Sequence, residues 1–285
     1  MRSFFVGERI LCFNRKVAMP RYYLTKLAAE QHSQAVDYAR EFLFNVLNIG
    51  EEMLSSGAEV SRVEDSIRRM CTAYGAERTD VFVISSVIIA TVYSPVYGAI
   101  SQTRRIKSTR YDLYKLSKLN ALSRRICSDM PLFDEVEKEL DDICTKLPHY
   151  SETGIVAMYA LISFSFSLFF GGSLLDAMAS GVIGVYLRCM DYVSRVLDLP
   201  ATIAAVLWSF TGGCLAMFFV YLDFGHSPEY ISVGNVMLLI PGMLLTNSIR
   251  DMFSGDILSA LLGFCNAFLL ATLIAFGFAL PTYIW

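Results

Sequence analysis

The C-terminal half of the chain contains long apolar stretches without a charged side chain. Each can supply the roughly 20 apolar residues that a helix needs to cross the ~30 Å hydrocarbon core of a bilayer. A helix satisfies its own backbone hydrogen bonds in lipid, so these stretches predict transmembrane helices. The four stretches are Thr153–Leu175, Leu199–Leu222, Tyr230–Ile249 and Ile257–Trp285.

A fifth apolar segment, Leu174–Val193, is interrupted by charges. It carries Asp176, Arg188 and Asp191. We interpret it as a fifth span whose charges lie near its ends or face the other helices, and a re-entrant segment is the alternative. The fold predicted for residues 151–285 is therefore a bundle of about five transmembrane helices.

The arginines of this half orient the predicted spans. If the N-terminal region is cytoplasmic, five spans place Arg188, Arg195 and Arg250 on the cytoplasmic side, as the positive-inside rule expects. The chain would then end outside the cell, at Trp285. This agreement favours five spans over four.

Small residues recur every four positions in three of the predicted spans, which is typical of helices that approach closely in lipid. We expect this packing within the bundle, with contact to another chain as the alternative. The longest row is Ser259, Gly263, Ala267, Ala271, Ala275 and Ala279.

The N-terminal half has the alternating pattern of a water-soluble domain. Its apolar periodicity predicts two helices, three strand-like segments and two further helices, so we expect a cytoplasmic α+β domain over residues 31–150. Residues 1–30 show no convincing pattern and are expected to be a flexible leader. The whole chain is thus predicted to be a mainly α membrane protein with an α+β N-terminal domain.

Charge supports this division. Of the 24 Lys and Arg residues, 21 precede residue 151, together with 19 of the 27 acidic residues. This balanced mixture forms no basic stripe, so we expect no nucleic-acid partner. The seven Cys show no CxxC spacing and the three His lie far apart, so we expect no metal site. No phosphate-binding glycine motif is visible, and we expect neither a cofactor nor catalysis.

Pro241-Gly242 falls inside the fourth uncharged stretch. Proline lacks an N–H and its ring clashes one turn back, so this pair predicts a helix break. Broken helices within the membrane line the substrate sites of many secondary transporters.

Polar residues follow the predicted break, in two i,i+4 rows if the segment is helical. Arg250 can offer a two-pronged fork to a substrate carboxylate. Asp251 can receive an ammonium group or carry a coupling proton, and Asp256 is a second proton candidate. Alternatively the segment is a cytoplasmic loop with Arg250 at the interface, because charge is costly in lipid. The candidate substrate and proton pathway is Thr246, Asn247, Arg250, Asp251 and Asp256.

Two strings carry a resemblance to a known family. The first reads SGAEVSRVE from Ser56 to Glu64 and contains Gly57, Glu59 and Arg62. The second reads PGMLLTNSIRDMFSGD over residues 241–256. In order and spacing they resemble the threonine/serine exporter family, in particular its short YjjP-like type, over about residues 34–281.

The resemblance implies an exporter in the inner cell membrane, working with a second small membrane subunit as a hetero-oligomer. It implies a small-molecule substrate, either threonine or serine or a dicarboxylate such as succinate. The alternative is a membrane-anchored sensor or enzyme that acts through its cytoplasmic domain, with residues 31–150 active by themselves.

Overall fold

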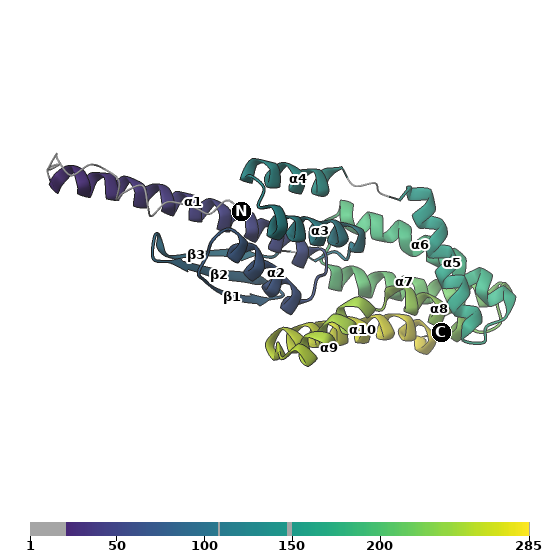
Figure 1. The fold of residues 1–285 in the computed structure, drawn as a ribbon. Coiled ribbons are helices and arrows are strands. Elements are labelled where there is room, and N and C mark those ends of the chain that lie inside the picture. Colours follow the sequence, from purple (N-terminus) through teal and green to yellow (C-terminus); the bar gives the residue numbers. More distant parts are fainter. Residues whose placement is uncertain (1–20, 108, 147–149, 285) are drawn as a thin grey trace.

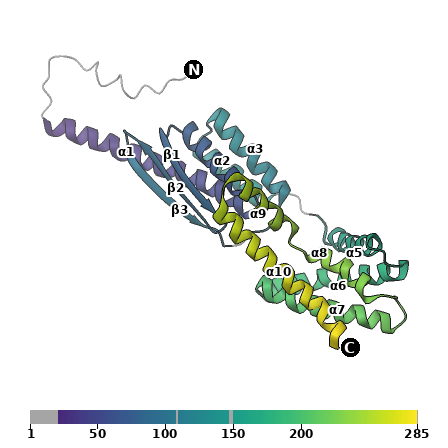
Figure 2. The ribbon, with the colours of Figure 1, turned by 90° about the horizontal axis from the view of Figure 1, so that it is seen from below.

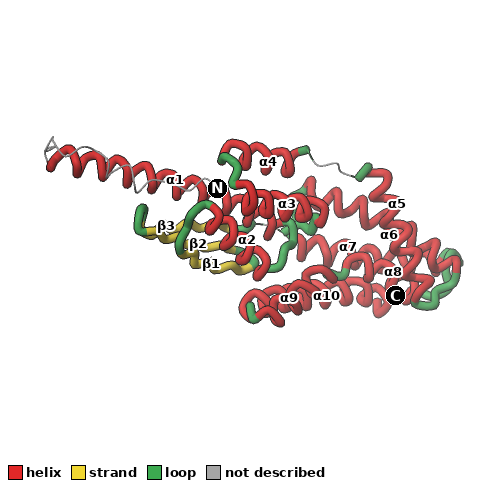
Figure 3. Tube along the Cα trace, viewed as in Figure 1, coloured by secondary structure: helices red, strands yellow, loops and turns green. Residues whose placement is uncertain are grey.

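A computed structural model describes residues 21–107, 109–146 and 150–284. The chain is mainly helical, and its strands all lie at one end of the molecule (Figure 3). We call residues 21–146 the N-terminal region and residues 150–284 the C-terminal region.

The N-terminal region has the element order ααβββαα that the sequence predicted. Helix α1 begins at Arg21, so the domain boundary expected at residue 31 falls inside a helix. Residues 1–20, the rest of the expected leader, lie outside the described residues. The elements are α1 (Arg21–Ser55), α2 (Val60–Ala73), β1 (Arg78–Ile84), β2 (Val87–Ser94), β3 (Gly98–Arg105), α3 (Leu113–Asp129) and α4 (Phe133–Thr145).

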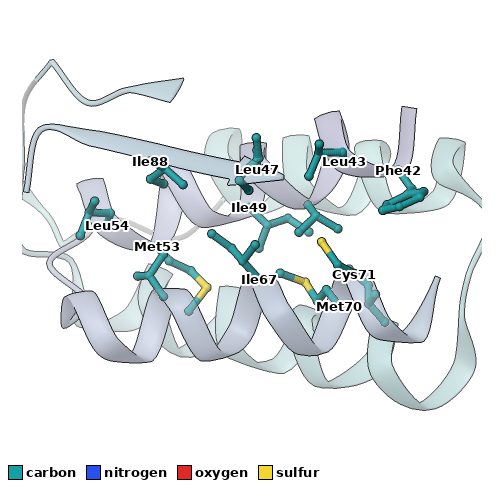
Figure 4. Packing of buried hydrophobic residues seen from close by; sticks show 14 of the residues in the cluster. Phe42, Leu43, Leu47, Ile49, Met53, Leu54, Ile67, Met70, Cys71 and Ile88 are labelled. Atoms are coloured by element: carbon teal, nitrogen blue, oxygen red, sulfur yellow. The ribbon is translucent and has the colours of Figure 1, made fainter. Parts of the chain in front are cut away.

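The strands form an antiparallel meander in the order β1-β2-β3, and α1 and α2 pack against it (Figure 1). Alternation along β2 explains this arrangement: Ile88, Ala90 and Val92 are buried, whereas Ile89 and Tyr93 are exposed. Side chains of successive strand residues point to opposite faces, so one face meets the helices. Figure 4 shows the apolar side chains of α1, α2 and β2 meeting in this core.

A tight turn joins α1 to α2. The Gly57 N–H donates to Leu54 O at 3.1 Å and the Ala58 N–H to Met53 O at 3.0 Å, the two bonds of a Schellman motif. Gly57 has φ +91°, and a Cβ there would lie 2.3 Å from the Tyr111 ring. Both the backbone conformation and the close approach therefore require glycine.

The C-terminal region consists of helices that run alongside one another (Figures 1 and 2). By length and composition, α5, α7 and α10 can each cross a membrane, and α8 with α9 is a fourth candidate as one bent span. The helices are α5 (Glu152–Phe169), α6 (Leu174–Val196), α7 (Ala201–Tyr221), α8 (Pro228–Leu239), α9 (Gly242–Ser254) and α10 (Ile257–Ile284).

Helix α6 corresponds to the fifth predicted span and differs from the others in its charges. Asp176 is only 1% exposed, and its carboxylate accepts the backbone N–H groups of His226 at 2.6 Å and Ser227 at 3.1 Å. Arg188 is also buried and pairs with Glu152 at 2.6 Å and with an acidic neighbour on α6 at 2.8 Å. These charges face protein partners. The 23-residue helix α6 is not among the described helices that are long and apolar enough to cross a membrane, so the fifth span stays a prediction.

The small-residue row of α10 serves helix packing in its first half only. Ser259 and Ala267 are buried, whereas Ala275 and Ala279 are exposed. A four-residue step advances about 40° beyond a full turn of a helix with 3.6 residues per turn, so the row winds away from its contact face. In the second half Gly277 makes the close approach, to α7.

Candidate functional site

The fourth predicted span is broken at Pro241-Gly242. Helix α8 ends at Leu239, α9 begins at Gly242, and the two axes differ by 54°. Pro241 stands at the start of α9, where a residue without an N–H leaves no helical hydrogen bond unmade. The break turns α9 toward the N-terminal region, where it lies against α2 (Figure 2).

Helix α9 holds the turn between α1 and α2 through polar contacts. The Asn247 side-chain amide donates to Gly57 O at 3.0 Å. The Val60 N–H donates to Asp251 Oδ1 at 3.3 Å. Arg250 forms an ion pair with Glu59. We call this set of contacts the motif junction, because it joins the two sequence strings 56–64 and 241–256.

The junction completes the N-terminus of α2. Glu59 occupies the N-cap position of α2 but makes no side-chain capping bond. Asp251 supplies a carboxylate oxygen to the first helical N–H instead. A negative charge is favourable at a helix N-terminus, where free N–H groups carry partial positive charge. The cap of α2 therefore comes from a helix about 190 positions later in the chain.

Further acidic groups lie beside the junction. Glu64 accepts the Val83 N–H at 2.9 Å, which ties α2 to β1. Burial raises the pKa of the Glu64 carboxyl above its usual value, and the nearby Asp256 carboxylate raises it further, while the Val83 N–H opposes both. The site thus combines the half-exposed guanidinium of Arg250 with several carboxylates.

The structure brings most of the predicted residues together and leaves two aside. Gly57, Glu59 and Glu64 meet the residues of α9 and Asp256, as the contacts above describe. Arg62 lies on the exposed face of α2. Thr246 is exposed, and its hydroxyl donates to Gly242 O one turn back on its own helix.

The polar row of Asn247 and Asp251 on α9 contacts the N-terminal region. Asn247 and Asp251 face the α1–α2 turn, because the turn presents a free carbonyl and a free N–H to them. An open pocket of about 350 Å³ lies elsewhere, on the surface between α7 and α10, and apolar side chains such as Phe210 and Phe276 line it.

Sequence reasoning missed a set of buried polar side chains in the helix bundle. Ser163, Ser180 and Asn235 are fully buried where α5, α6 and α8 meet. The available signal was an asparagine within the uncharged run after Tyr230, because polar residues are rare in spans and face the bundle interior.

Comparison with known proteins identifies the family. Residues 45–285 match the family model described as "Putative threonine/serine exporter". The chain belongs to the threonine/serine exporter family. The match includes both strings of the motif junction, and the apolar helices agree with a membrane protein of this family.

Two curated relatives carry transport names. One from Mycobacterium tuberculosis, named "Probable threonine/serine exporter", is 26% identical over 250 residues, which are 84% of this chain and 45% of the relative. One from Klebsiella aerogenes, named "Probable succinate transporter subunit YjjP", is 23% identical over 239 residues, which are 82% of this chain and 90% of the relative. The chain thus spans about half the length of the first relative. No solved structure matches it significantly.

Proposed function

We propose that this protein is a membrane subunit of a secondary exporter for small carboxylate-bearing metabolites. The substrate is threonine or serine, or a dicarboxylate such as succinate, the compounds in the relatives' names. Residues 31–150 form a cytoplasmic domain, and residues 151–285 cross the inner membrane five times, with residue 285 outside. The observation that carries the proposal is the motif junction, in which the broken span holds the N-terminal region.

A second small membrane subunit completes the exporter. The K. aerogenes relative is named as a transporter subunit. This name supports a transporter that is built from more than one chain.

The junction acts as the cytoplasmic gate and the first substrate contact. The Arg250 side chain is 55% exposed although it is paired with Glu59, so a substrate carboxylate can reach it and replace Glu59. A guanidinium binds either carboxylate through the same fork. Loss of the Glu59 pair loosens α9 from α2, and Asp251 and Asp256 then accept the coupling proton or a substrate ammonium group.

The decisive experiment is export from the native host with this chain deleted and then restored as variants. Arg250→Ala removes the fork, and we expect export to fall at least about tenfold, the effect of losing a charged hydrogen bond. Arg195→Ala is the matched control, because Arg195 is also an arginine at a helix end, 53% exposed and paired with an acidic residue. It should export at the wild-type rate.

A charge exchange separates gating from substrate binding. The double variant Glu59→Arg with Arg250→Glu restores the ion pair but places the guanidinium at position 59 instead of on α9. If Arg250 also binds substrate, export stays low in the double variant. Full rescue would limit Arg250 to a structural role, and normal export by Arg250→Ala would refute the site. Unchanged threonine, serine and succinate levels outside the deletion strain would refute the function itself.

A further inference from the structure

Four polar side chains lie fully buried where α5, α6 and α8 meet, and we call them the bundle cluster: Ser163, Ser167, Ser180 and Asn235. The Asn235 amide nitrogen donates to Ser180 Oγ at 3.0 Å and to Ile231 O at 2.9 Å, which uses both of its hydrogens. Ser180 Oγ in turn lies 3.0 Å from Ser163 O, across the α5–α6 contact. These bonds fix the orientation of the amide.

Three atoms of the bundle cluster have no hydrogen-bond partner. They are the Asn235 Oδ1 and the hydroxyls of Ser163 and Ser167, and all three are shielded from solvent. Within a membrane bundle no bulk water is available to bond them, so such atoms are costly to bury. Alanine would pack at either serine position without this penalty, and the cluster is therefore better explained by a ligand than by packing.

The chemistry of the cluster selects the ligand group. Asn235 Oδ1 can only accept a hydrogen bond, and the serine hydroxyls can accept or donate. The four side chains include no cation, so they offer nothing to neutralise a carboxylate. A group that donates hydrogen bonds, such as an ammonium or a hydroxyl, matches the acceptor Asn235 Oδ1 and can also bond to a serine hydroxyl.

The helices are tightly packed around the bundle cluster. A Cβ on Gly234 of α8 would lie 2.4 Å from Ser180 Oγ and 2.6 Å from Ser163 O. A metabolite therefore enters only if α8 moves away from α5 and α6. The break at Pro241-Gly242, at the end of α8, leaves α8 free to move separately from α9.

We propose that the bundle cluster is a subsite for the hydrogen-bond-donating group of the exported metabolite, with Asn235 Oδ1 as its principal acceptor. The inference rests on the proposed export function and sharpens it. The substrate is a small amino acid rather than succinate, because succinate has no such group near neutral pH. The principal acceptor, Asn235, lies on α8, the half of the broken span opposite to Arg250 on α9.

Serine-to-alanine variants test the subsite without endangering the fold. Ser163→Ala and Ser167→Ala remove hydroxyls that make no hydrogen bond here, so the melting temperature of the full chain in detergent should not fall. We expect amino-acid export to fall about threefold to tenfold in each, and at least about tenfold in Asn235→Ala. Ser209→Ala is the control: Ser209 is equally buried in the bundle, but lies on α7 and donates to Ala205 O. It should export normally.

Ligand probes separate this inference from the proposed function. The melting temperature of the purified full chain is measured with three compounds. L-serine carries an ammonium group and a hydroxyl, L-alanine carries the ammonium group alone, and succinate carries neither. We expect stabilisation by L-serine and a smaller effect of L-alanine, both lost in Asn235→Ala. Export by the intact system combined with wild-type rates in all three variants would overturn the subsite alone, as would a wild-type chain that exports succinate and no amino acid. A deletion strain that exports threonine, serine and succinate as the wild type does would overturn the function instead.

Discussion

The two regions of this molecule differ in how many large apolar side chains they bury completely. Among the residues whose burial the structure describes, eleven of the twelve largest fully buried side chains belong to the N-terminal region, and Ile183 of α6 is the exception. In the C-terminal region the helices meet over serine and glycine, while large residues such as Phe268 and Phe276 face outward. Burial of apolar surface away from water drives the packing of the N-terminal region. Lipid gives no such driving force, so close backbone contacts and polar bonds hold the helices of the C-terminal region together.

The largest change in stability is expected from a comparison of two phenylalanines, one from each region. Phe42 is fully buried among Tyr38, Tyr74 and Tyr97, whereas Phe268 is 65% exposed on α10. Phe42→Ala should lower the unfolding free energy of the full chain in detergent by about 3–5 kcal/mol, because it leaves a cavity. Phe268→Ala should change it by less than about 0.5 kcal/mol. Equal losses in denaturant titrations of the two variants would contradict the contrast.

A second test compares glycines that differ in their surroundings. A Cβ on Gly277 would lie 2.5 Å from Ser209 Cβ and 3.1 Å from the Phe210 backbone nitrogen, whereas one on Gly242 would meet nothing within 4 Å. Gly277→Ala should therefore cost about 1–3 kcal/mol by forcing α10 away from α7. Gly242→Ala should be neutral or stabilise by up to about 1 kcal/mol. Thermal unfolding of both variants in the same detergent measures the difference. If Gly277→Ala is as stable as the wild type, the contact between α7 and α10 is not tightly packed.

The smallest expected effect is a pH dependence in the N-terminal region. Burial and the Asp256 carboxylate raise the pKa of Glu64 in the folded chain. The folded state then binds this proton more tightly than the unfolded state. Its stabilising contribution is complete below the ordinary glutamate pKa and is lost as pH rises through the raised value.

Glu64→Gln keeps an oxygen that can accept the Val83 N–H but removes the charge. Relative to wild type, the variant should gain stability between pH 4 and pH 7, by less than about 1 kcal/mol because the group is only partly buried. Unfolding at the two pH values measures this gain. If the wild type instead becomes more stable relative to the variant as pH rises, the prediction is wrong and the Glu64 charge stabilises the folded chain.

Features that depend on short stretches of sequence were predictable. The ααβββαα order follows from apolar periodicity, and the break at Pro241 follows from the missing N–H and the ring clash of proline. The end of α1 at Ser55 follows from the glycine at position 57, whose left-handed conformation terminates a helix. Each of these rests on interactions within a few residues along the chain.

The partners of the candidate residues were not predictable in the same way. The sequence shows Asn247 and Asp251 on one helix face, but nothing in the pattern reveals that Gly57 and Val60 lie opposite them. Nor does it reveal that Arg62 and Thr246 stay outside the site. Side-chain partners across 190 positions depend on how whole helices dock, which local periodicity does not encode.

The sequence by itself determined the class of this protein: apolar runs too long for a soluble chain, a breaking proline, and two strings that belong to an exporter family. Only the tertiary structure decided that these strings meet, with Asp251 capping α2 and Arg250 pairing with Glu59. It also decided that Asn235 is left with an unpaired acceptor inside the bundle. The reason is physical: hydropathy is summed along the chain, whereas hydrogen bonds depend on which atoms packing brings within about 3 Å.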